Sequence, residues 1–363
     1  MKGTVISSTN NTARVLCDDG ATRLCSIKGK RIKSLAGTYN GLAVGDFVEV
    51  SPTEGGKGMI TALQTRRNTF GRYNEKGKAE QAIAANIDRV FCVTSPHLPP
   101  FRPRFIDRLA VLAEWARVPF VIVLNKTDLG IPEDVAERLH DYEALGYRVV
   151  RTCARSGEGI DELRELLQNQ VGVFAGQSGV GKSSLLNTLF PGIKRRTGEV
   201  SEKYDRGKHT TTMAEMILAE ASFSAEPSFS GEAPFSGGGA EAGVRIIDTP
   251  GIRRLALRSL PAADLASCFP EMQALISDCA YGSKCSHTDE EGCVVREAAE
   301  EGTIHADRYE SYLRIREELD QPIVWKKSGV RDPGRRERGL SGKVRTKIRG
   351  SGSADLEEHD ALF

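Results

Sequence analysis

GQSGVGKSSLLNTLF, residues 176–190, decides how the centre of the chain folds. It matches the pattern G-x-x-x-x-G-K-[ST], with Gly176, Gly181, Lys182 and Ser183 at the fixed positions. The apolar VGVFA precedes the loop and the helix-like SSLLNTLF follows it, which is the context that a phosphate-binding loop requires. Apolar runs and helix-like segments alternate around it, so we expect a doubly wound α/β domain.

Each part of this loop has a chemical role towards a nucleotide. The glycines let backbone N–H groups and the N-terminus of the following helix face phosphate oxygens. We expect Lys182 to neutralise charge on the β- and γ-phosphates and Ser183 to ligate Mg²⁺. An ordinary glycine turn is the alternative, but the flanking strand and helix argue against it. The nucleotide-binding residues predicted here are Gly176, Gln177, Ser178, Gly179, Val180, Gly181, Lys182, Ser183 and Ser184.

NKTDL, residues 125–129, stands at the carboxyl end of the apolar run PFVIVLN, where open α/β sheets bind ligands. The Asp128 carboxylate would accept hydrogen bonds from the N1 and N2 donors of guanine and would reject adenine, which selects GTP over ATP. Taken alone, NKTD could also be a turn capped by its Asp. TCARSG follows another strand and adds two residues, so the predicted base-binding set is Asn125, Lys126, Thr127, Asp128, Cys153 and Ala154.

Two further segments resemble the switches of a GTPase. In RIIDTPG, Asp248 is expected to hold the Mg²⁺ shell through water, and the N–H of Gly251 to reach the γ-phosphate. In GKHTTT, Thr211 is our choice for the hydroxyl that completes magnesium coordination, although HTTT alone would suit a polar loop. The expected ligands are therefore GTP or GDP and Mg²⁺, with Ser183, Thr211 and Asp248 around the metal.

These elements occur in rotated order, because the base readers precede the phosphate loop and the switches follow it. A parallel α/β domain whose ends lie close together can be joined there and opened elsewhere without a change in packing. Only QNQ, residues 168–170, separates the helix-like IDELRELL from the strand before the loop, as such a join predicts. The second switch then continues directly into the C-terminal domain, so loss of the γ-phosphate can reposition that domain.

Ile252 follows the glycine of DTPG, where Ras-like enzymes carry a glutamine that orients water. We therefore expect slow hydrolysis by the free protein and a group supplied or positioned by a partner. His209 in GKHTTT is the nearest candidate to orient water. A solvated His209 without a catalytic role is an equally open interpretation.

The segment Cys279-x5-Cys285-x-His287-x5-Cys293 offers three thiolates and one imidazole. This donor set suits one tetrahedral zinc ion, and eight cysteines in 363 residues are too few for a disulfide scaffold. The close spacing of Cys285 and His287 is unusual, so buried cysteines without a metal remain the alternative.

Bulk properties leave room for several domains. Lys plus Arg number 50 against 49 acidic residues, so the net charge neither favours nor excludes an acidic partner. The chain shows no signal peptide and no apolar run long enough to cross a bilayer, and we expect a cytoplasmic monomer without membrane contact.

The first 65 residues read as five short strands of an OB or SH3-like barrel, whose basic loop residues Lys28, Lys30, Arg31 and Lys33 could bind nucleic acid or simply be solvated.

Together these segments resemble the bacterial ribosome small-subunit-dependent GTPase A family. The motifs that carry the resemblance are VGDFVEV, AANIDRVFCV, NKTDL, GQSGVGKSSLLN, GKHTTT, IIDTPGIR, CSHTDEEGCVV and RYESYLRI. It implies late maturation of the 30S subunit, with GTP hydrolysis stimulated by that subunit and coupled to release, and 16S rRNA as a partner. The chain departs from the family pattern in a longer first zinc spacing at Cys279, a missing proline in HTDEEGC and an insertion between the switch strands.

The expected fold is multidomain α/β. Residues 1–70 would form an N-terminal OB-fold β-barrel that binds RNA, and 71–255 a circularly permuted P-loop GTPase domain with a low-complexity insertion at 221–243. Residues 256–322 would form a C-terminal helical zinc-binding domain, and 323–363 a basic, disordered tail. Two rival functions stay open: a permuted GTPase of 50S assembly, or an RNA-binding scaffold with little turnover.

Overall fold

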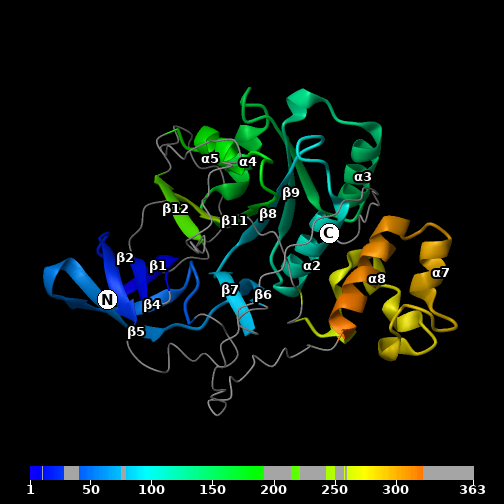
Figure 1. Cartoon of the computed structure of the whole chain (residues 1–363), viewed down its shortest axis with the longest axis horizontal. Coiled ribbons are helices and arrows are strands. Elements are labelled where there is room, and N and C mark those ends of the chain that lie inside the picture. The colour runs from blue at the N-terminus through cyan, green and yellow to red at the C-terminus, as the bar shows by residue number, and fades with distance from the viewer. Residues whose placement is uncertain are drawn as a thin grey trace, which may run out of the picture. The chain divides into compact units, whose positions relative to one another are not determined.

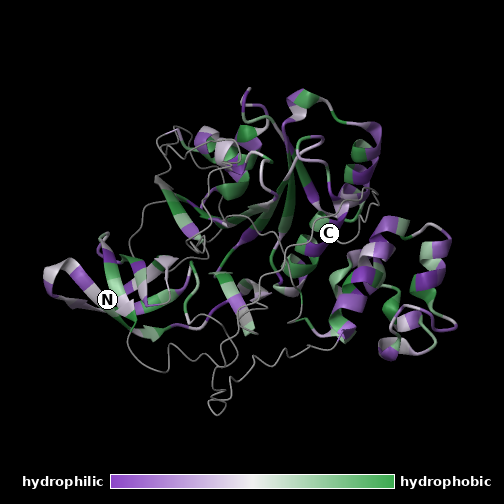
Figure 2. Cartoon of the chain, viewed as in Figure 1, coloured by the Kyte–Doolittle hydropathy of each residue, from purple (hydrophilic) through white to green (hydrophobic). Residues whose placement is uncertain are grey.

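The computed structural model describes residues 1–9, 11–27, 41–74, 79–191, 214–220, 243–249, 257 and 260–321. At its centre lies a sheet of parallel strands whose residues are apolar and covered on both faces. Every residue of β9 (Phe120–Asn125) and β11 (Val171–Gly176) is buried, and in β8 (Arg89–Thr94) only Arg89 is partly exposed. Figure 2 shows this hydrophobic character along the central strands. The sheet is completed by β10 (Arg148–Thr152), β13 (Gly243–Asp248) and the antiparallel β12 (Glu215–Glu220).

Helices cover both faces of this sheet (Figure 1). Leu163 of α4 (Ile160–Leu167) and Leu185 of α5 (Lys182–Leu189) pack on one face with Val93 and Val123. Leu109 of α2 (Pro103–Trp115) and Leu139 of α3 (Glu133–Ala144) pack on the other face with Val90 and Ile122. The predicted doubly wound domain is therefore confirmed.

The strand order shows the permutation directly. Across the sheet the order is β10-β9-β8-β11-β13-β12. If the chain is read from β11, the six strands run β11, β12, β13, β8, β9, β10. In that reading the second and third strands lie on one side of β11 and the last three on the other. This is the arrangement expected of a GTPase whose phosphate-loop strand comes first. Helix α4 ends at Leu167 and β11 begins at Val171, which leaves the three residues predicted for the join.

The N-terminal strands close into a barrel of the OB type, as expected. Their order is β1-β2-β3-β5-β4, and β4 pairs back onto β1. Val5, Val15, Val48 and Ile60 fill the interior. At the edge of the barrel, Ser7 of β1 lies opposite Glu215 of β12. The strands are β1 (Lys2–Ser8), β2 (Thr12–Cys17), β3 (Thr22–Ile27), β4 (Phe47–Thr53) and β5 (Lys57–Leu63), with the 3-10 turn η1 (Glu54–Gly56) before β5.

A hairpin of β6 (Thr69–Asn74) and β7 (Ala79–Ala85) follows the barrel, and the boundary expected at residue 70 falls inside it. Two arginines before the hairpin are held within the fold. The Arg66 guanidinium donates to both carboxylate oxygens of the buried Asp46, at 2.7 and 2.8 Å. Arg67 pairs with Asp88 at 2.8 Å. The basic loop that carries Lys28 to Lys33 lies outside the described residues, as do 221–242 and 322–363.

The C-terminal segment is built from short helical turns around an aromatic core. Phe269 and Tyr312 are fully buried there, and their rings meet edge to face at 5.5 Å. Among the described residues, no helix is both long and apolar enough to cross a bilayer. The elements are η3 (Ala262–Asp264), η4 (Ala266–Cys268), α6 (Pro270–Gln273), η5 (Ile276–Asp278), η6 (Gly282–Lys284), α7 (Val294–Glu300) and α8 (Ala306–Asp320).

A buried charge cluster joins α8 to the α/β domain. Arg308 is 1% exposed and donates to Asp107 of α2 at 2.7 Å and to both carboxylate oxygens of Glu271 at 2.7 and 3.0 Å. Tyr142 of α3 donates to the same Asp107 at 2.7 Å, and Ser311 donates to its second oxygen. The guanidinium of Arg308 is shared by two carboxylates, and Arg138 of α3 lies 3.8 Å from Asp107, so these contacts link α8 to α2 and α3.

Leu109→Ala tests the core between α2 and the sheet. Leu109 is fully buried, so we expect the variant to lose about 2–5 kcal/mol in the free energy of unfolding. Urea denaturation followed by circular dichroism measures this loss. Leu24→Ala is the control, because Leu24 is 50% exposed and its truncation should change stability by less than about 0.5 kcal/mol. Equal losses in the two variants would contradict the packing described here.

Candidate functional site

Three segments that are distant in sequence line one pocket of about 370 Å³ at the carboxyl ends of the parallel strands. They come from the end of β9 with the following 3-10 turn η2 (Thr127–Leu129), from the loop after β10, and from the start of α5; Leu98 of the loop after β8 also lines the pocket. Seven of the predicted nucleotide-binding residues lie on its wall: Asn125, Lys126, Asp128, Cys153, Ala154, Gly181 and Ser184.

Asn125 holds the three segments together. Its side chain is 1% exposed, and its amide nitrogen donates to the carbonyl of Val180 in the phosphate loop at 2.8 Å. Its amide oxygen accepts from the backbone N–H of Ala154 at 3.2 Å and from the Thr152 hydroxyl at 3.4 Å. A side chain that both donates and accepts is needed at this position, which explains why an asparagine stands there.

Lys126 and Asp128, which follow Asn125 in the chain, are each held by hydrogen bonds. The backbone of Lys126 is left-handed, with φ of 69°, and its ammonium donates to the carbonyls of Gly179, at 2.7 Å, and Leu98. The Cys153 thiol donates to the Asp128 carboxylate at 3.3 Å. Thr127 turns away from the pocket wall, and its hydroxyl donates to the Thr152 carbonyl at 3.2 Å.

The glycines of the phosphate loop are required by close approach. Gly181 has a φ of 94°, and a Cβ there would clash with the Asn125 amide. A Cβ on Gly176 would clash with the Val93 carbonyl of the neighbouring strand. Between them, Ser178 and Gly179 are exposed, whereas Val180 is buried. The loop therefore keeps its backbone free on one side while its other side packs on β8 and β9.

Lys182 is the first residue of α5, and its ammonium folds back over the loop. It donates to the carbonyls of Gly176 at 2.7 Å and Gln177 at 2.8 Å. Burial lowers the pKa of Lys182, and the nearby Asp248 carboxylate acts in the opposite direction. Asp248 is buried at the end of β13, where it lies opposite Phe174 in the register with β11. Ser183 follows on α5 and is partly exposed.

Three predicted residues lie outside the described part of the chain: His209, Thr211 and Gly251. Conversely, the pocket includes three residues that the sequence did not single out, namely Leu98, Leu129 and Arg155. Leu129 and Arg155 directly follow predicted base-binding residues, so their proximity could have been anticipated. Leu98 comes from the loop after β8 and carries no sequence signal.

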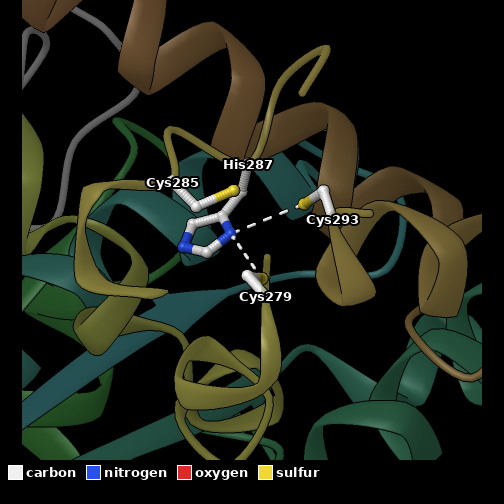
Figure 3. Close-up of side chains that lie close together, drawn as sticks. All are labelled: Cys279, Cys285, His287 and Cys293. Carbon is white, nitrogen blue, oxygen red and sulfur yellow. Dashed lines mark hydrogen bonds between the residues drawn. The ribbon is translucent and has the colours of Figure 1, made fainter. Parts of the chain in front are cut away.

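The cysteine cluster forms a second site. Cys279, Cys285, His287 and Cys293 are all buried, and their ligand atoms lie within 4.8 Å of one another (Figure 3). The Nδ1 atom of His287 lies 3.5 Å from the sulfur of Cys279 and 3.6 Å from that of Cys293. Zinc bonds of about 2.3 Å to sulfur and about 2.0–2.1 Å to nitrogen place two tetrahedral ligands about 3.6 Å apart. The four side chains therefore fit one zinc ion.

The protonation states around this cluster also suit a cation. Burial lowers the pKa of His287, which favours the neutral imidazole that a metal ligand needs. Burial and the neighbouring thiols raise the pKa of Cys285 to about 12, because thiolates so close together repel one another. A bound cation removes that repulsion and lets the thiols ionise.

The backbone of the cluster is held by hydrogen bonds from its own loop and from α8. The Glu290 carboxylate accepts from the N–H groups of Ser286 at 2.6 Å and Thr288 at 3.1 Å. Tyr309 donates to the His287 carbonyl at 2.9 Å. These contacts fix His287, whose backbone is left-handed with φ of 57°, in the orientation that faces the sulfurs.

Sequence comparison assigns this combination of sites to one family. Residues 63–225 match the family model described as RsgA GTPase. The small ribosomal subunit biogenesis GTPase RsgA 2 of Bacteroides thetaiotaomicron is 35% identical over 326 residues, which are 88% of this chain and 98% of that protein. The corresponding RsgA of Chlorobaculum parvum is 38% identical over 330 residues, covering 88% and 99%.

Solved structures agree with this assignment. The crystal structure of YjeQ from Thermotoga maritima has a TM-score of 0.64 and 32% identity, and the match covers 88% of this chain and 98% of that one. YloQ, a circularly permuted GTPase, has a TM-score of 0.59 over 88% and 94% at 24% identity, which supports the fold. Since relatives above 30% identity align over nearly their whole length, this chain belongs to the RsgA GTPase family.

Proposed function

We propose that this chain is a GTPase that binds the small ribosomal subunit during the late stage of its assembly, hydrolyses GTP in response to the subunit, and is then released. Family membership makes it a GTP hydrolase that uses GTP, GDP and Mg²⁺. The observation that carries the proposal is the Asn125 side chain, which ties the base-reading turn to the phosphate loop around one pocket.

In this proposal Asp128 selects guanine, because its carboxylate accepts from the two donors on N1 and N2 of the base. The hydrogen bond from Cys153 supports it by orienting one carboxylate oxygen, and the aliphatic part of Lys126 and the backbone of Ala154 bound the base on its sides. Adenine presents an acceptor and no amino group at these positions, so the same carboxylate repels it.

We further propose that the loop from Gly176 to Ser184 holds the phosphates through its backbone N–H groups. Lys182 would exchange its present carbonyl partners for phosphate oxygens, and its burial strengthens that interaction. Ser183, Thr211 and Asp248 would hold Mg²⁺, and Gly251 would meet the γ-phosphate. His209 stays a candidate to orient water, with a purely solvated role as the alternative.

For the cysteine cluster we propose one structural zinc ion, bound by Cys279, Cys285, His287 and Cys293. The four donors leave no open coordination position, which is the arrangement of structural rather than catalytic zinc. Cys279 lies as close to His287 as Cys293 does, and this supports its inclusion despite the longer spacing in the sequence.

The names of the relatives favour the small subunit over the large one as the partner. We also propose a division into four parts: a barrel at 1–70, a GTPase domain at 71–255, a zinc domain at 256–322 and a tail at 323–363. The hairpin β6–β7 lies at the boundary between the first two. Contact with 16S rRNA, a monomeric state and a cytoplasmic location also remain predictions.

Asp128→Asn should change the preferred base. An asparagine offers one acceptor and one donor, so its donor would face the guanine amino group, whereas xanthine has an oxygen there. We expect affinity for GDP to fall by about 100-fold or more and affinity for xanthosine diphosphate to rise. Isothermal titration calorimetry measures both. Cys153→Ala is the control, since it should keep the preference for guanine; a preference that also stays with guanine in Asp128→Asn would contradict the proposed role.

Purified small ribosomal subunits should raise the rate of GTP hydrolysis by at least about tenfold over the free protein, because a partner supplies or positions groups that the free site lacks. Lys182→Ala should lose about 100-fold or more of the stimulated rate. Phosphate release measures both rates. An equal stimulation by large subunits would favour a role in 50S assembly. A Lys182→Ala variant that still performs the protein's role in cells would favour an RNA-binding scaffold with little turnover.

One zinc ion per chain is expected by mass spectrometry of the metal content. Cys293→Ser should reduce this content to well below one and destabilise the C-terminal helices, because structural zinc contributes directly to folding. Cys268→Ala is the matched control: Cys268 is also buried but lies outside the cluster, so its variant should keep the metal. Full zinc content in Cys293→Ser would count against the site.

A further inference from the structure

A second and larger cleft, of about 920 Å³, lies between the end of α2 and the C-terminal domain. Trp115 and Arg117 line it from the side of α2. Ser277, Gly282 and Ser283 line it from η5 and η6, the short turns that flank Cys279 and precede Cys285. The nucleotide pocket is lined by none of these residues, so the two sites are separate.

One exposed aromatic side chain lines this cleft, and a second belongs to a residue next to its lining. In the part of the chain that the structure describes, the aromatic side chains among the exposed large hydrophobic residues are Trp115, 42% exposed, and Tyr281, 59% exposed. Tyr281 directly precedes Gly282, which lines the cleft. Other large aromatic rings of the described fold, such as Phe269 and Tyr312, are buried. Aromatic rings left in solvent beside a cleft are typical of surfaces on which bases stack.

Basic groups accompany both rings. Arg117 follows Trp115 by two residues and is exposed where α2 ends, in a left-handed conformation with φ of 54°. Lys284 follows Tyr281 by three residues and is also exposed. Among the described residues that line the cleft, Glu114 is the one carboxylate, and burial raises its pKa. Hydroxyl and amide groups of Ser277, Ser283 and Gln273 also line the cleft, beside the apolar Ile276.

The two walls are held in fixed relation without a ligand. The Arg308–Asp107–Glu271 cluster joins α8 and α6 to α2, and the partly buried pair of Arg108 with Glu318, at 2.8 Å, also joins α2 to α8. The cysteine cluster holds the turns that carry Tyr281 and Ser283. A cleft whose walls are preorganised loses little entropy when it binds, so even a small ligand can bind there specifically.

We propose that this cleft binds one unstacked nucleotide of a single-stranded RNA segment, with the base against Trp115 and the backbone phosphate near Arg117. Stacking on an aromatic ring and neutralisation of a phosphate are the two contacts by which single-stranded RNA is held. The inference deepens the proposed function and rests on it for the source of the RNA, which is the small subunit. A protein segment that binds the same cleft is the alternative outcome of the test.

Trp115 can report its own contact. The chain has two tryptophans, and Trp325 lies outside the described residues, so Trp325→Phe leaves Trp115 as the only indole. A single-stranded decaribonucleotide of mixed sequence should quench the fluorescence of this variant in a saturable way. The same sequence in a duplex should not, because its bases are already stacked. No quenching by the single strand would overturn the proposal.

Variants of the two walls test the affinity. Trp115→Ala should weaken binding of the decaribonucleotide, measured by fluorescence anisotropy of a labelled strand, by about 5- to 100-fold, and Trp115→Phe should keep it within about threefold. Tyr281→Ala gives an independent reading from the residue that precedes Gly282 of the opposite wall. Arg117→Ala should weaken binding less and reduce the dependence of log affinity on log salt concentration by about one. The rate of GTP hydrolysis by the free protein should be unchanged in all four.

Cosedimentation with small subunits separates the failure of this inference from that of the proposed function. If the unaltered chain does not bind the subunit, the proposed function fails. If it binds, and Trp115→Ala and Tyr281→Ala bind equally well to both subunit and oligonucleotide, only the cleft is wrong. If both variants lose the subunit while all proteins bind the oligonucleotide equally, the cleft contacts a ribosomal protein, and the proposal for RNA is overturned.

Discussion

The fold of the nucleotide site depends on one buried amide. Asn125 donates to the phosphate loop at Val180 and accepts from Ala154 in the loop after β10, so a single side chain sets the distance between the segments that would meet base and phosphates. Gly181 is constrained by the same group, because any side chain there would occupy its space. The rotation of the chain order leaves these contacts intact, since they depend on neighbouring strands and not on which strand comes first.

The C-terminal domain is attached to this site at two places. In sequence it follows the second switch, and in space the Arg308 cluster fixes it to α2 and α3, which flank the strand that ends at Asn125. Breaking a buried ion pair leaves charges without a partner, so a domain held in this way does not hinge freely. If the proposed second switch changes conformation with the nucleotide, these contacts oppose movement of the whole C-terminal domain.

Most of the fold followed from the sequence because buried parallel strands are continuous apolar runs, as in β9 and β11. Helix α3 was missed, although Val135, Leu139 and Tyr142 show its apolar spacing after Pro132. The β6–β7 hairpin was missed because alanines dominate its second strand. The pocket residues could be predicted where they belong to a recognisable motif, as Asn125 and Asp128 do. Leu98, the charge cluster and the cleft at Trp115 could not be predicted, since they arise from segments far apart in the chain.

A crystal structure of the chain with GDP and Mg²⁺ tests the central claim most directly. We expect the guanine base between Lys126 and Ala154, with both N1 and N2 within hydrogen-bonding distance of the Asp128 carboxylate. The β-phosphate should lie at the N-terminus of α5 beside Lys182. A nucleotide bound elsewhere, or a base that does not contact Asp128 while the phosphates occupy the loop, would contradict it.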